Sequence, residues 1–472
     1  FLVGFWYSMP VQLFFLHFRK YQIFLIFWYV LFATINGHFL EKFGANSLFL
    51  SPEYFNNVNL LSAAFVGLAI GIFIMSWNIT TFILHHREFQ FLATTAQPFL
   101  KYCINNGILP IIFLVNYFSE LIYFDTYREL MSAAEITLLI IGFLGGFSLA
   151  IFIAFAYFFG ADKTIYSTMS NTIIDANKQY LDNIKNKILA TEKYKMRVDW
   201  FFTARFALRK PRDVRHYTQD FLDTIFKRHH FAAVIAYFIA FLFLIGIGYT
   251  SDARLSQIPA AASITIFFAL IIAVVGAFSV FLKNWSLPVI ALIYLMFNIL
   301  YEHDIIDPRT KFFGLDYTNE LKDKPIYSKE SIIALANDSA IAIDKQKFIA
   351  RLNAWKARQH DDKPIFYIIN TSGGGIRSAT FTFRTLQHID SLMNGKLMSK
   401  TMFINGASGG MLGAAYYRAL YLKKLNQDTI NLQSATYLDD ISKDLLNPIF
   451  SSFVARDVIA PVQKFMLGNN TY

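Results

Sequence analysis

Two glycine-rich turns near the end of this 472-residue chain contain the residue types that acyl transfer requires. The first holds three consecutive glycines, Gly373, Gly374 and Gly375, and the second holds Ser408 in a G-x-S-x-G pattern. Glycines beside a serine permit a strained turn that leaves its hydroxyl exposed at the N-terminus of a helix. Successive glycine N–H groups can approach a substrate closely and stabilise a developing oxyanion. The two turns predict a nucleophile and an oxyanion hole.

Flanking residues extend both candidates. Gly406, Gly409 and Gly410 surround the serine and complete the sharp turn that a nucleophile elbow needs. Arg377 lies two residues after the glycine triplet, where its planar guanidinium can bind a phosphate with two hydrogen bonds. These residues add a substrate phosphate contact to the predicted site.

Strand-like and helix-like segments lie on either side of each turn. Residues 364–370 form an apolar run long enough for a buried strand, and residues 378–392 have a helix-like pattern. Residues 401–405 and 411–425 repeat that order around Ser408. A strand, a sharp turn with serine at its tip and then a helix is the context in which G-x-S-x-G indicates a nucleophile elbow. We therefore expect the two turns side by side at the carboxyl ends of neighbouring parallel strands.

The combination of these motifs resembles the patatin-like phospholipase family and the related cytosolic phospholipases A2, over residues 326–472. A lone G-x-S-x-G is weak, because a chain of this length contains roughly 0.1 to 0.2 such patterns by chance. The added glycine triplet, arginine and strand-helix contexts make the resemblance specific. It implies an α/β hydrolase domain with Ser408 as nucleophile, the glycine triplet as oxyanion loop and Arg377 as phosphate contact, with no metal and no cofactor.

The sequence departs from the family pattern at the general base. By the resemblance this base is an Asp, usually in an Asp-Gly-Gly or Asp-Gly-Ala turn, yet no Asp-Gly pair follows Ser408. All ten histidines precede Ser408, so this chain cannot build the Ser, Asp, His order of ordinary α/β-hydrolases. The last of them, His388, is predicted to be a surface or packing residue. We expect the domain to be incomplete at its C-terminus, and no base is assigned among Asp428, Asp439, Asp440, Asp444 and Asp457.

The rest of the chain has the composition of a membrane protein. Hydrophobic residues make up 55% of the sequence and charged residues 16%, against about 25% charged residues in average proteins. The single cysteine, Cys103, excludes an intrachain disulfide and a cysteine-based metal site. Residues 1–301 predict an α-helical transmembrane bundle of about 6–7 helices, at the apolar runs 21–36, 60–84, 104–124, 136–159, 231–249, 260–282 and 285–301.

The sequence leaves three features of this bundle open. Residues 285–301 are short and contain Pro288, so they either span or turn back. Residues 1–18 are also apolar and suit either an eighth helix or an interfacial segment. The polar residues near helix ends are interpreted as lying at the membrane interface: Asn78, His85, His86, Glu120 and Asp125. The alternative for the two carboxylates, Glu120 and Asp125, is that they mark a polar pathway through the membrane.

Charge predicts the orientation of the bundle. Residues 160–230 contain 14 Lys and Arg against 8 Asp and Glu, so the positive-inside rule places this basic loop in the cytoplasm. The basic residues at 205–215 also suit contact with anionic lipid headgroups. The positive-inside rule, however, already accounts for basic residues in this loop. If residues 285–301 span, the catalytic domain follows a linker at 302–325 on the opposite side of the membrane. The net charge of +10 comes without nucleic-acid-binding patterns, so no nucleic-acid partner is expected.

The sequence as a whole predicts a polytopic membrane anchor fused to an α/β patatin-like hydrolase domain. The expected function is lipid degradation, in which membrane phospholipids are hydrolysed through a Ser408 acyl-enzyme and a Ser-Asp dyad. The alternative is a membrane scaffold or transporter whose patatin-like domain is inactive. Membrane lipids are the expected partners, and the sequence specifies no protein partner.

Overall fold

The computed structural model of the chain describes residues 2–20, 22–86, 88–185, 196–212, 258–282, 285–303, 327–359, 361–426, 429–443 and 445–452, with a few short pieces outside these ranges. Its contacts divide the chain into two units. The membrane unit comprises Phe1–Thr310 together with Leu446–Tyr472, and the second unit comprises Lys311–Leu445. The boundary at Thr310 lies inside the predicted linker at 302–325, whereas residues from Leu446 onward group with the membrane unit.

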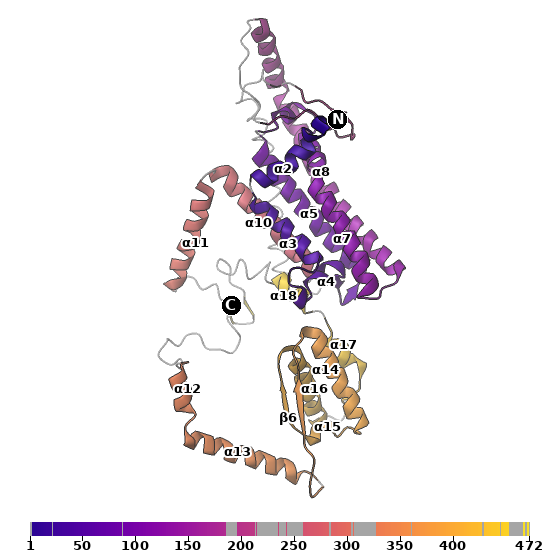
Figure 1. The fold of residues 1–472 in the computed structure, drawn as a ribbon, viewed down its shortest axis with the longest axis vertical. Coiled ribbons are helices and arrows are strands. Elements are labelled where there is room, and N and C mark those ends of the chain that lie inside the picture. The colour runs from indigo at the N-terminus through magenta and orange to yellow at the C-terminus, as the bar shows by residue number, and fades with distance from the viewer. Residues whose placement is uncertain are drawn as a thin grey trace. The chain divides into compact units, whose positions relative to one another are not determined.

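The membrane unit consists mainly of helices, as Figure 1 shows. A short β-hairpin, formed by β1 (Glu53–Tyr54) and β2 (Asn57–Val58), lies between α4 and α5. The described helices of this unit are α1 (Leu2–Trp6), α2 (Met9–Arg19), α3 (Ile23–Ile35), α4 (Ala45–Leu50), α5 (Leu60–His85), α6 (Pro98–Asn105), α7 (Ile108–Tyr127), α8 (Ala133–Lys185), α10 (Ala260–Leu282), α11 (Ser286–Glu302) and α18 (Leu446–Ser452).

Among the described residues, four helices are long and apolar enough to cross a membrane: α5, α7, the Ala133–Gly160 part of α8, and the Ala260–Ser279 part of α10. They confirm the apolar helices predicted at 60–84, 104–124, 136–159 and 260–282. The run at 21–36 forms α3, which with α2 makes a pair bent by 100° that counts as a fifth span only if both helices cross together. Residues 285–301 form the shorter α11, and the predicted span at 231–249 lies outside the described residues.

Glycines let α5 and α8 pack backbone against backbone. A Cβ added to Gly67 of α5 would lie 2.0 Å from the Phe143 carbonyl oxygen, and one added to Gly146 of α8 would lie 1.9 Å from the Ala64 carbonyl oxygen. Both distances are far shorter than van der Waals contact, so any larger residue would force the helices apart. Close approach of this kind drives helix association in lipid, where dispersion contacts replace the hydrophobic effect.

The helices α5, α8 and α10 run in the same direction. Leu60, at the start of α5, lies against Gly142 near the start of α8. Thr80, near the other end of α5, lies against Gly276 in the second half of α10. Between these points the Ser76 hydroxyl of α5 donates a 2.7 Å hydrogen bond to a backbone carbonyl of α10. The three helices therefore all begin at one end of the bundle and run in parallel toward the other end.

The β1–β2 hairpin identifies the end at which these helices begin. Tyr54 of the hairpin packs on Phe65 in the first turns of α5, with ring centroids 4.8 Å apart. Phe65 also packs against the start of α10 beside Ala262. We call this end of the membrane unit the hairpin end. The opposite end, from which α8 continues to Lys185, is called the loop end.

The second unit combines helices with two parallel strands. Strand β5 pairs with β6 in parallel, and α14 connects them. This β-α-β arrangement is smaller than the α/β domain predicted from the sequence. Its described elements are α12 (Lys329–Leu335), α13 (Asp338–Ala357), β5 (Tyr367–Thr371), α14 (Gly375–Leu392), α15 (Leu397–Lys400), β6 (Thr401–Gly406), α16 (Ser408–Asn426) and α17 (Ala435–Ile441).

One face of the β5–β6 sheet is covered and the other is largely open. Ile369 and Ile404 pack into the core formed by α14 and α16. On the opposite face the Phe348 ring of α13 stacks on Phe403 at 5.4 Å, while Ile368 remains 50% exposed. The prediction of a buried strand at 364–370 is therefore wrong within the described residues. An apolar run indicates that a strand can be buried, but it does not show whether other elements cover both faces of the sheet.

Candidate active site

Parallel pairing of β5 and β6 brings the two glycine-rich turns to the same edge of the sheet. Thr371, the last residue of β5, is opposite Gly406, the last residue of β6. The chain leaves both strands in the same direction and enters α14 and α16, which pack side by side. The structure thus brings the serine turn and the glycine triplet together, in the arrangement expected from the repeated strand, turn and helix.

Ser408 has an unusual backbone conformation. Its φ is +48°, in the left-handed region that is unfavourable for residues with a Cβ, and it is the first residue of α16. Strain of this kind persists only where the surrounding packing imposes it. The residue is exposed, so its hydroxyl is open to solvent at the helix N-terminus. These are the properties that a nucleophile elbow gives its serine.

The glycines after Ser408 provide the packing that imposes this strain. A Cβ on Gly409 would lie 1.8 Å from the Gly375 carbonyl oxygen, and one on Gly410 would lie 2.2 Å from the Ser372 carbonyl oxygen. The start of α16 is thereby held directly against the backbone of the first turn. Gly406 is equally constrained, since its Cβ would lie 2.0 Å from the Thr371 hydroxyl oxygen.

The glycine triplet lies beside the serine. A Cβ on Gly373 would be 3.2 Å from the Ser408 Cβ and 3.9 Å from its Oγ. Gly374 and Gly375 have φ values of +147° and +65°, which side chains disfavour. Because α14 begins at Gly375, the N–H groups of its first turn have no partners within the helix. The turn therefore presents hydrogen-bond donors within about one ester group of the serine hydroxyl.

Three hydrogen bonds that the sequence did not indicate support this geometry. The Ser378 hydroxyl of α14 donates a 2.8 Å hydrogen bond to the Ser372 carbonyl and closes the glycine turn. Deeper in the unit, Asp390 of α14 accepts hydrogen bonds from the Tyr417 hydroxyl of α16 at 2.7 Å and from the Leu397 amide at 3.0 Å. Burial, together with this bond to Asp390, raises the pKa of Tyr417 above its ordinary value. The helices that carry the two turns are thus fixed to each other by a buried polar pair.

Arg377 occupies the first turn of α14, directly after the glycine triplet, and its side chain is exposed. This placement puts a guanidinium on the same helix as the N–H groups of the triplet. His388 lies further along α14 and is exposed, in agreement with the prediction of a surface residue.

The general base is not among the residues that the structure places at the serine. Within the described part of the chain, the Ser408 hydroxyl makes no hydrogen bond to a carboxylate or an imidazole. Asp439 and Asp440 are exposed on α17, and Asp440 forms an ion pair with Lys443 at 2.5 Å. The other candidates, Asp428, Asp444 and Asp457, lie outside the described residues.

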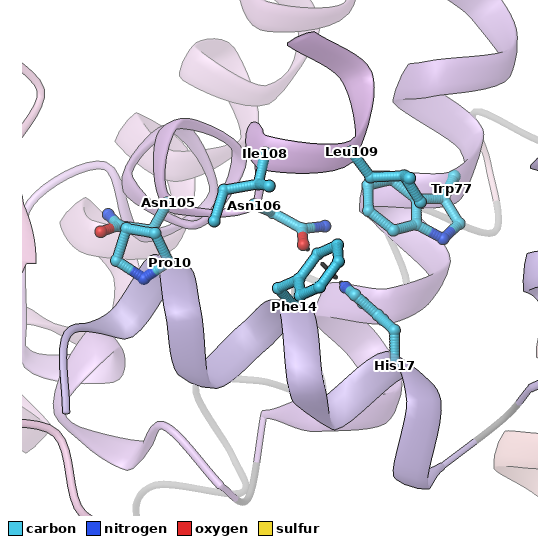
Figure 2. Close-up of a pocket in the computed structure, with 8 residues that line it drawn as sticks. All are labelled: Pro10, Phe14, His17, Trp77, Asn105, Asn106, Ile108 and Leu109. Carbon is cyan, nitrogen blue, oxygen red and sulfur yellow. Dashed lines mark hydrogen bonds between the residues drawn. The ribbon is translucent and has the colours of Figure 1, made fainter. Parts of the chain in front are cut away.

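The membrane unit contains a separate cluster of buried polar side chains beside a small hollow. His17 of α2 shares a 2.7 Å hydrogen bond with the Asn106 side-chain oxygen, and Figure 2 shows the two side chains pointing toward each other. The Asn106 amide in turn donates to the Asn78 side chain of α5 at 3.0 Å. The lining residues are Pro10, Phe14, His17, Trp77, Asn105, Asn106, Ile108 and Leu109.

Asn78 and His85, which the sequence predicts at the membrane interface, are buried among the helices, and His85 is the last residue of α5. Asp125 is buried as well, and the Ser51 hydroxyl donates a hydrogen bond to its carboxylate. Their partners lie far away in sequence, as His17 and Asn106 are 89 positions apart, and helical periodicity carries no information on such contacts. The hydrogen bonds named here connect segments of the membrane unit that are distant in sequence.

Comparisons with protein-family profiles, with curated proteins and with solved structures found no match. Among the described residues, no group of three or more His, Cys, Asp or Glu side chains is placed to hold a metal ion. The description of the candidate site therefore rests on the chain's own geometry: a strained serine, a glycine turn in contact with it and an arginine on the following helix.

Proposed function

We propose that this protein is a membrane-anchored serine lipid acyl hydrolase that acts on membrane phospholipids. The observation that carries the proposal is the strained Ser408, at φ +48°, in contact with the glycine triplet at the carboxyl ends of two parallel strands. The resemblance of both motifs to patatin-like phospholipases supports the same chemistry. Apolar helices of spanning length supply the anchor, so the substrate is present at high local concentration.

In the proposed reaction, the Ser408 Oγ attacks the carbonyl carbon of the ester and its proton passes to a carboxylate base. The N–H groups of the glycine triplet stabilise the negative charge that develops on the carbonyl oxygen. The tetrahedral intermediate then expels the alcohol, which takes up the proton, and leaves the acyl group on Ser408. Water hydrolyses this acyl-enzyme by the same steps in reverse order. Arg377 binds the phosphate of the substrate and thereby orients the ester.

The alternative function, a membrane scaffold or transporter with an inactive hydrolase-like domain, has one observation in its favour. No carboxylate or imidazole in the described part of the chain is hydrogen-bonded to Ser408. The two functions differ in whether the serine hydroxyl is activated. A fluorophosphonate probe reads this difference directly, because it modifies activated serines and leaves ordinary ones unlabelled.

The test compares the purified full chain with Ser408→Ala and with Ser391→Ala, a matched change at an exposed serine of α14. We expect the probe to label the parent and Ser391→Ala, and Ser408→Ala to lose both labelling and phospholipid turnover by at least about 10³-fold. Turnover that survives in Ser408→Ala excludes this serine as the nucleophile. A parent chain that neither reacts with the probe nor hydrolyses lipid favours the inactive alternative.

The orientation is part of the proposal. The excess of Lys and Arg in residues 160–230 supports a cytoplasmic basic loop. The candidate site then lies on the opposite side of the membrane if α11 crosses.

A further inference from the structure

Helix α18 lies at the hairpin end of the membrane unit, where the Asn447 side chain connects it to α10 and to the hairpin. The Asn447 side-chain oxygen accepts a 2.6 Å hydrogen bond from the Ala260 amide, in the first turn of α10. Its side-chain nitrogen donates a 2.5 Å hydrogen bond to the Glu53 carbonyl of the hairpin. Asn447 is 4% exposed, so both bonds are shielded from water. Figure 1 shows α18, in yellow, beside α4 at this end.

These bonds satisfy one backbone N–H group of α10 and one backbone carbonyl of the hairpin. The first N–H groups of a helix lack intrahelical acceptors, and Asn447 supplies one for α10. A buried hydrogen bond of this kind contributes to stability mainly because its loss leaves a desolvated group unpaired. The segment that follows the second unit along the chain is therefore a structural part of the hairpin end.

The path of the chain before the second unit starts at the other end of the bundle. Helix α10 begins at the hairpin end and finishes at the loop end, and Figure 1 shows α11 turning back after it. Most of the described side chains of α11 are exposed in the membrane unit, for example Leu292, Tyr294 and Leu295, as expected for a helix that faces lipid. Two paths are open to such a helix: it crosses to the hairpin end, or it stays at the loop end.

Only the first path agrees with the position of α18. No described helix between residues 327 and 445 is of spanning length and apolar, and residues 304–326 are polar in sequence. The chain from residue 303 to residue 445 thus has no segment with which to pass through a bilayer. Both of its ends must lie on one side, and α18 fixes that side as the hairpin end.

We infer that α11 crosses the membrane and that α18 is a second anchor, so that residues 303–445 lie on the hairpin side, opposite the basic loop. The 17 residues of α11 rise about 25 Å, slightly less than the ~30 Å hydrocarbon core. Trp285, directly before the helix, and Tyr301, near its end, are residue types that suit the two interfaces, which makes up the shortfall. The inference is independent of any activity of Ser408. If the proposed function also holds, the enzyme draws its phospholipids from the leaflet on the hairpin side.

Sidedness is measured by labelling single cysteines in a Cys103→Ser background of the full chain in sealed membranes. The positions are Asn57 in the hairpin, Lys329 at the start of α12 and Lys193 in the basic loop, each changed to Cys. With a membrane-impermeant maleimide, we expect Asn57→Cys and Lys329→Cys to react from one side and Lys193→Cys from the other. Permeabilised membranes should label all three. Reaction of Lys329→Cys from the same side as Lys193→Cys overturns the inference, whether or not Ser408 is catalytic.

The anchor itself is tested by changing Asn447. Asn447→Leu removes both hydrogen bonds at similar volume, whereas Asn353→Leu is a matched change at an exposed asparagine of α13. We expect trypsin to cleave after Lys443, just before α18, about tenfold faster in Asn447→Leu and at the parent rate in Asn353→Leu. Asn447→Asp keeps the acceptor for Ala260 but sets a buried carboxylate against the Glu53 carbonyl, so it should also increase the cleavage rate. Equal cleavage rates in the parent and both Asn447 variants exclude an anchoring role for α18.

Discussion

Glycine has different purposes in the two units of this protein. In the membrane unit, Gly67 and Gly146 have helical backbones and are required only because a neighbouring helix occupies the space of a Cβ. In the second unit, Gly374 and Gly375 have positive φ values, so the backbone conformation itself disfavours a side chain. A clash between two helices can be relieved by moving them apart. A clash at the serine turn can be relieved only by moving the candidate reacting groups. We therefore expect glycine substitutions in the membrane unit to lower stability and those at the serine turn to lower activity.

The largest effect in this comparison is expected at Gly409, where a close backbone contact lies inside the candidate site. In Gly409→Ala the new Cβ would lie 1.8 Å from the Gly375 carbonyl oxygen, so the serine turn and the glycine triplet must separate. Because a displacement of about 1 Å costs roughly 100-fold in rate, we expect lipid turnover to fall by about that factor. Initial rates on phospholipid vesicles measure it.

The control for this change is Gly395→Ala, at a glycine with φ +78° but open space around it. It introduces backbone strain without a steric clash, away from the candidate site, and turnover per folded molecule should stay at the parent level. If both variants lose turnover equally, the contact between Gly409 and the triplet has no special role.

The membrane unit should respond in stability instead. Gly146→Val places a side chain where the Ala64 carbonyl oxygen lies, at a Cβ distance of 1.9 Å. Overpacking of this kind costs about 1–3 kcal/mol, so we expect a lower unfolding temperature in detergent or nanodiscs. Turnover per folded molecule should not change. The neighbouring Gly145 has nothing within 4 Å of its Cβ position, so Gly145→Val should leave the unfolding temperature almost unaltered. Equal destabilisation by the two variants would contradict the proposed α5–α8 contact.

Arg377→Ala should have a moderate effect that depends on the substrate. Loss of a guanidinium contact with a phosphate is expected to lower kcat/KM on phospholipids by about tenfold, the equivalent of one charge-assisted hydrogen bond. Neutral acyl esters, which have no phosphate, should be hydrolysed at nearly the parent rate. Arg384→Ala, a change at another arginine of α14, serves as the control. Equal losses on both substrate types would remove the phosphate role.

The smallest expected effect concerns the buried pair of Tyr417 and Asp390. Tyr417→Phe leaves the Asp390 oxygen without its 2.7 Å donor and should lower the free energy of unfolding by about 1–2 kcal/mol. The raised pKa of Tyr417 adds a pH dependence with a definite sign. The unfolded chain releases the tyrosine proton near pH 10 and the folded chain only at higher pH, so this stabilisation is complete below pH 10 and declines above it.

Denaturant unfolding of the parent and Tyr417→Phe at pH 8 and pH 10.5 measures both effects. The difference between the two proteins should shrink at the higher pH. Tyr421→Phe, at a half-buried tyrosine of the same helix, should match the parent at both values. A constant difference across this range would show that Tyr417 titrates alike in the folded and unfolded chains.

Local sequence patterns account for the features of this fold that depend on neighbours in the chain. The order of strand, turn and helix around Ser408 indicated both the positive φ and the approach of the glycine triplet, because each follows from the geometry of a short segment. Contacts between distant segments left no such pattern. The hydrogen bond of His17 with Asn106 and that of Asn447 with Ala260 join residues 89 and 187 positions apart. The open face over Ile368 was missed for the same reason, since burial depends on layers contributed elsewhere.

The return of the chain to the membrane unit at Leu446 makes residues 311–445 an insertion between two segments of one folded body. An insertion closes a loop, and the entropy of loop closure grows only with the logarithm of loop length, by about 0.6 kcal/mol for each doubling. The membrane unit should therefore tolerate large changes in the size of the inserted part. Chains with longer or shorter insertions at this point can keep the same bundle, so the candidate chemistry is free to vary while its anchor is retained.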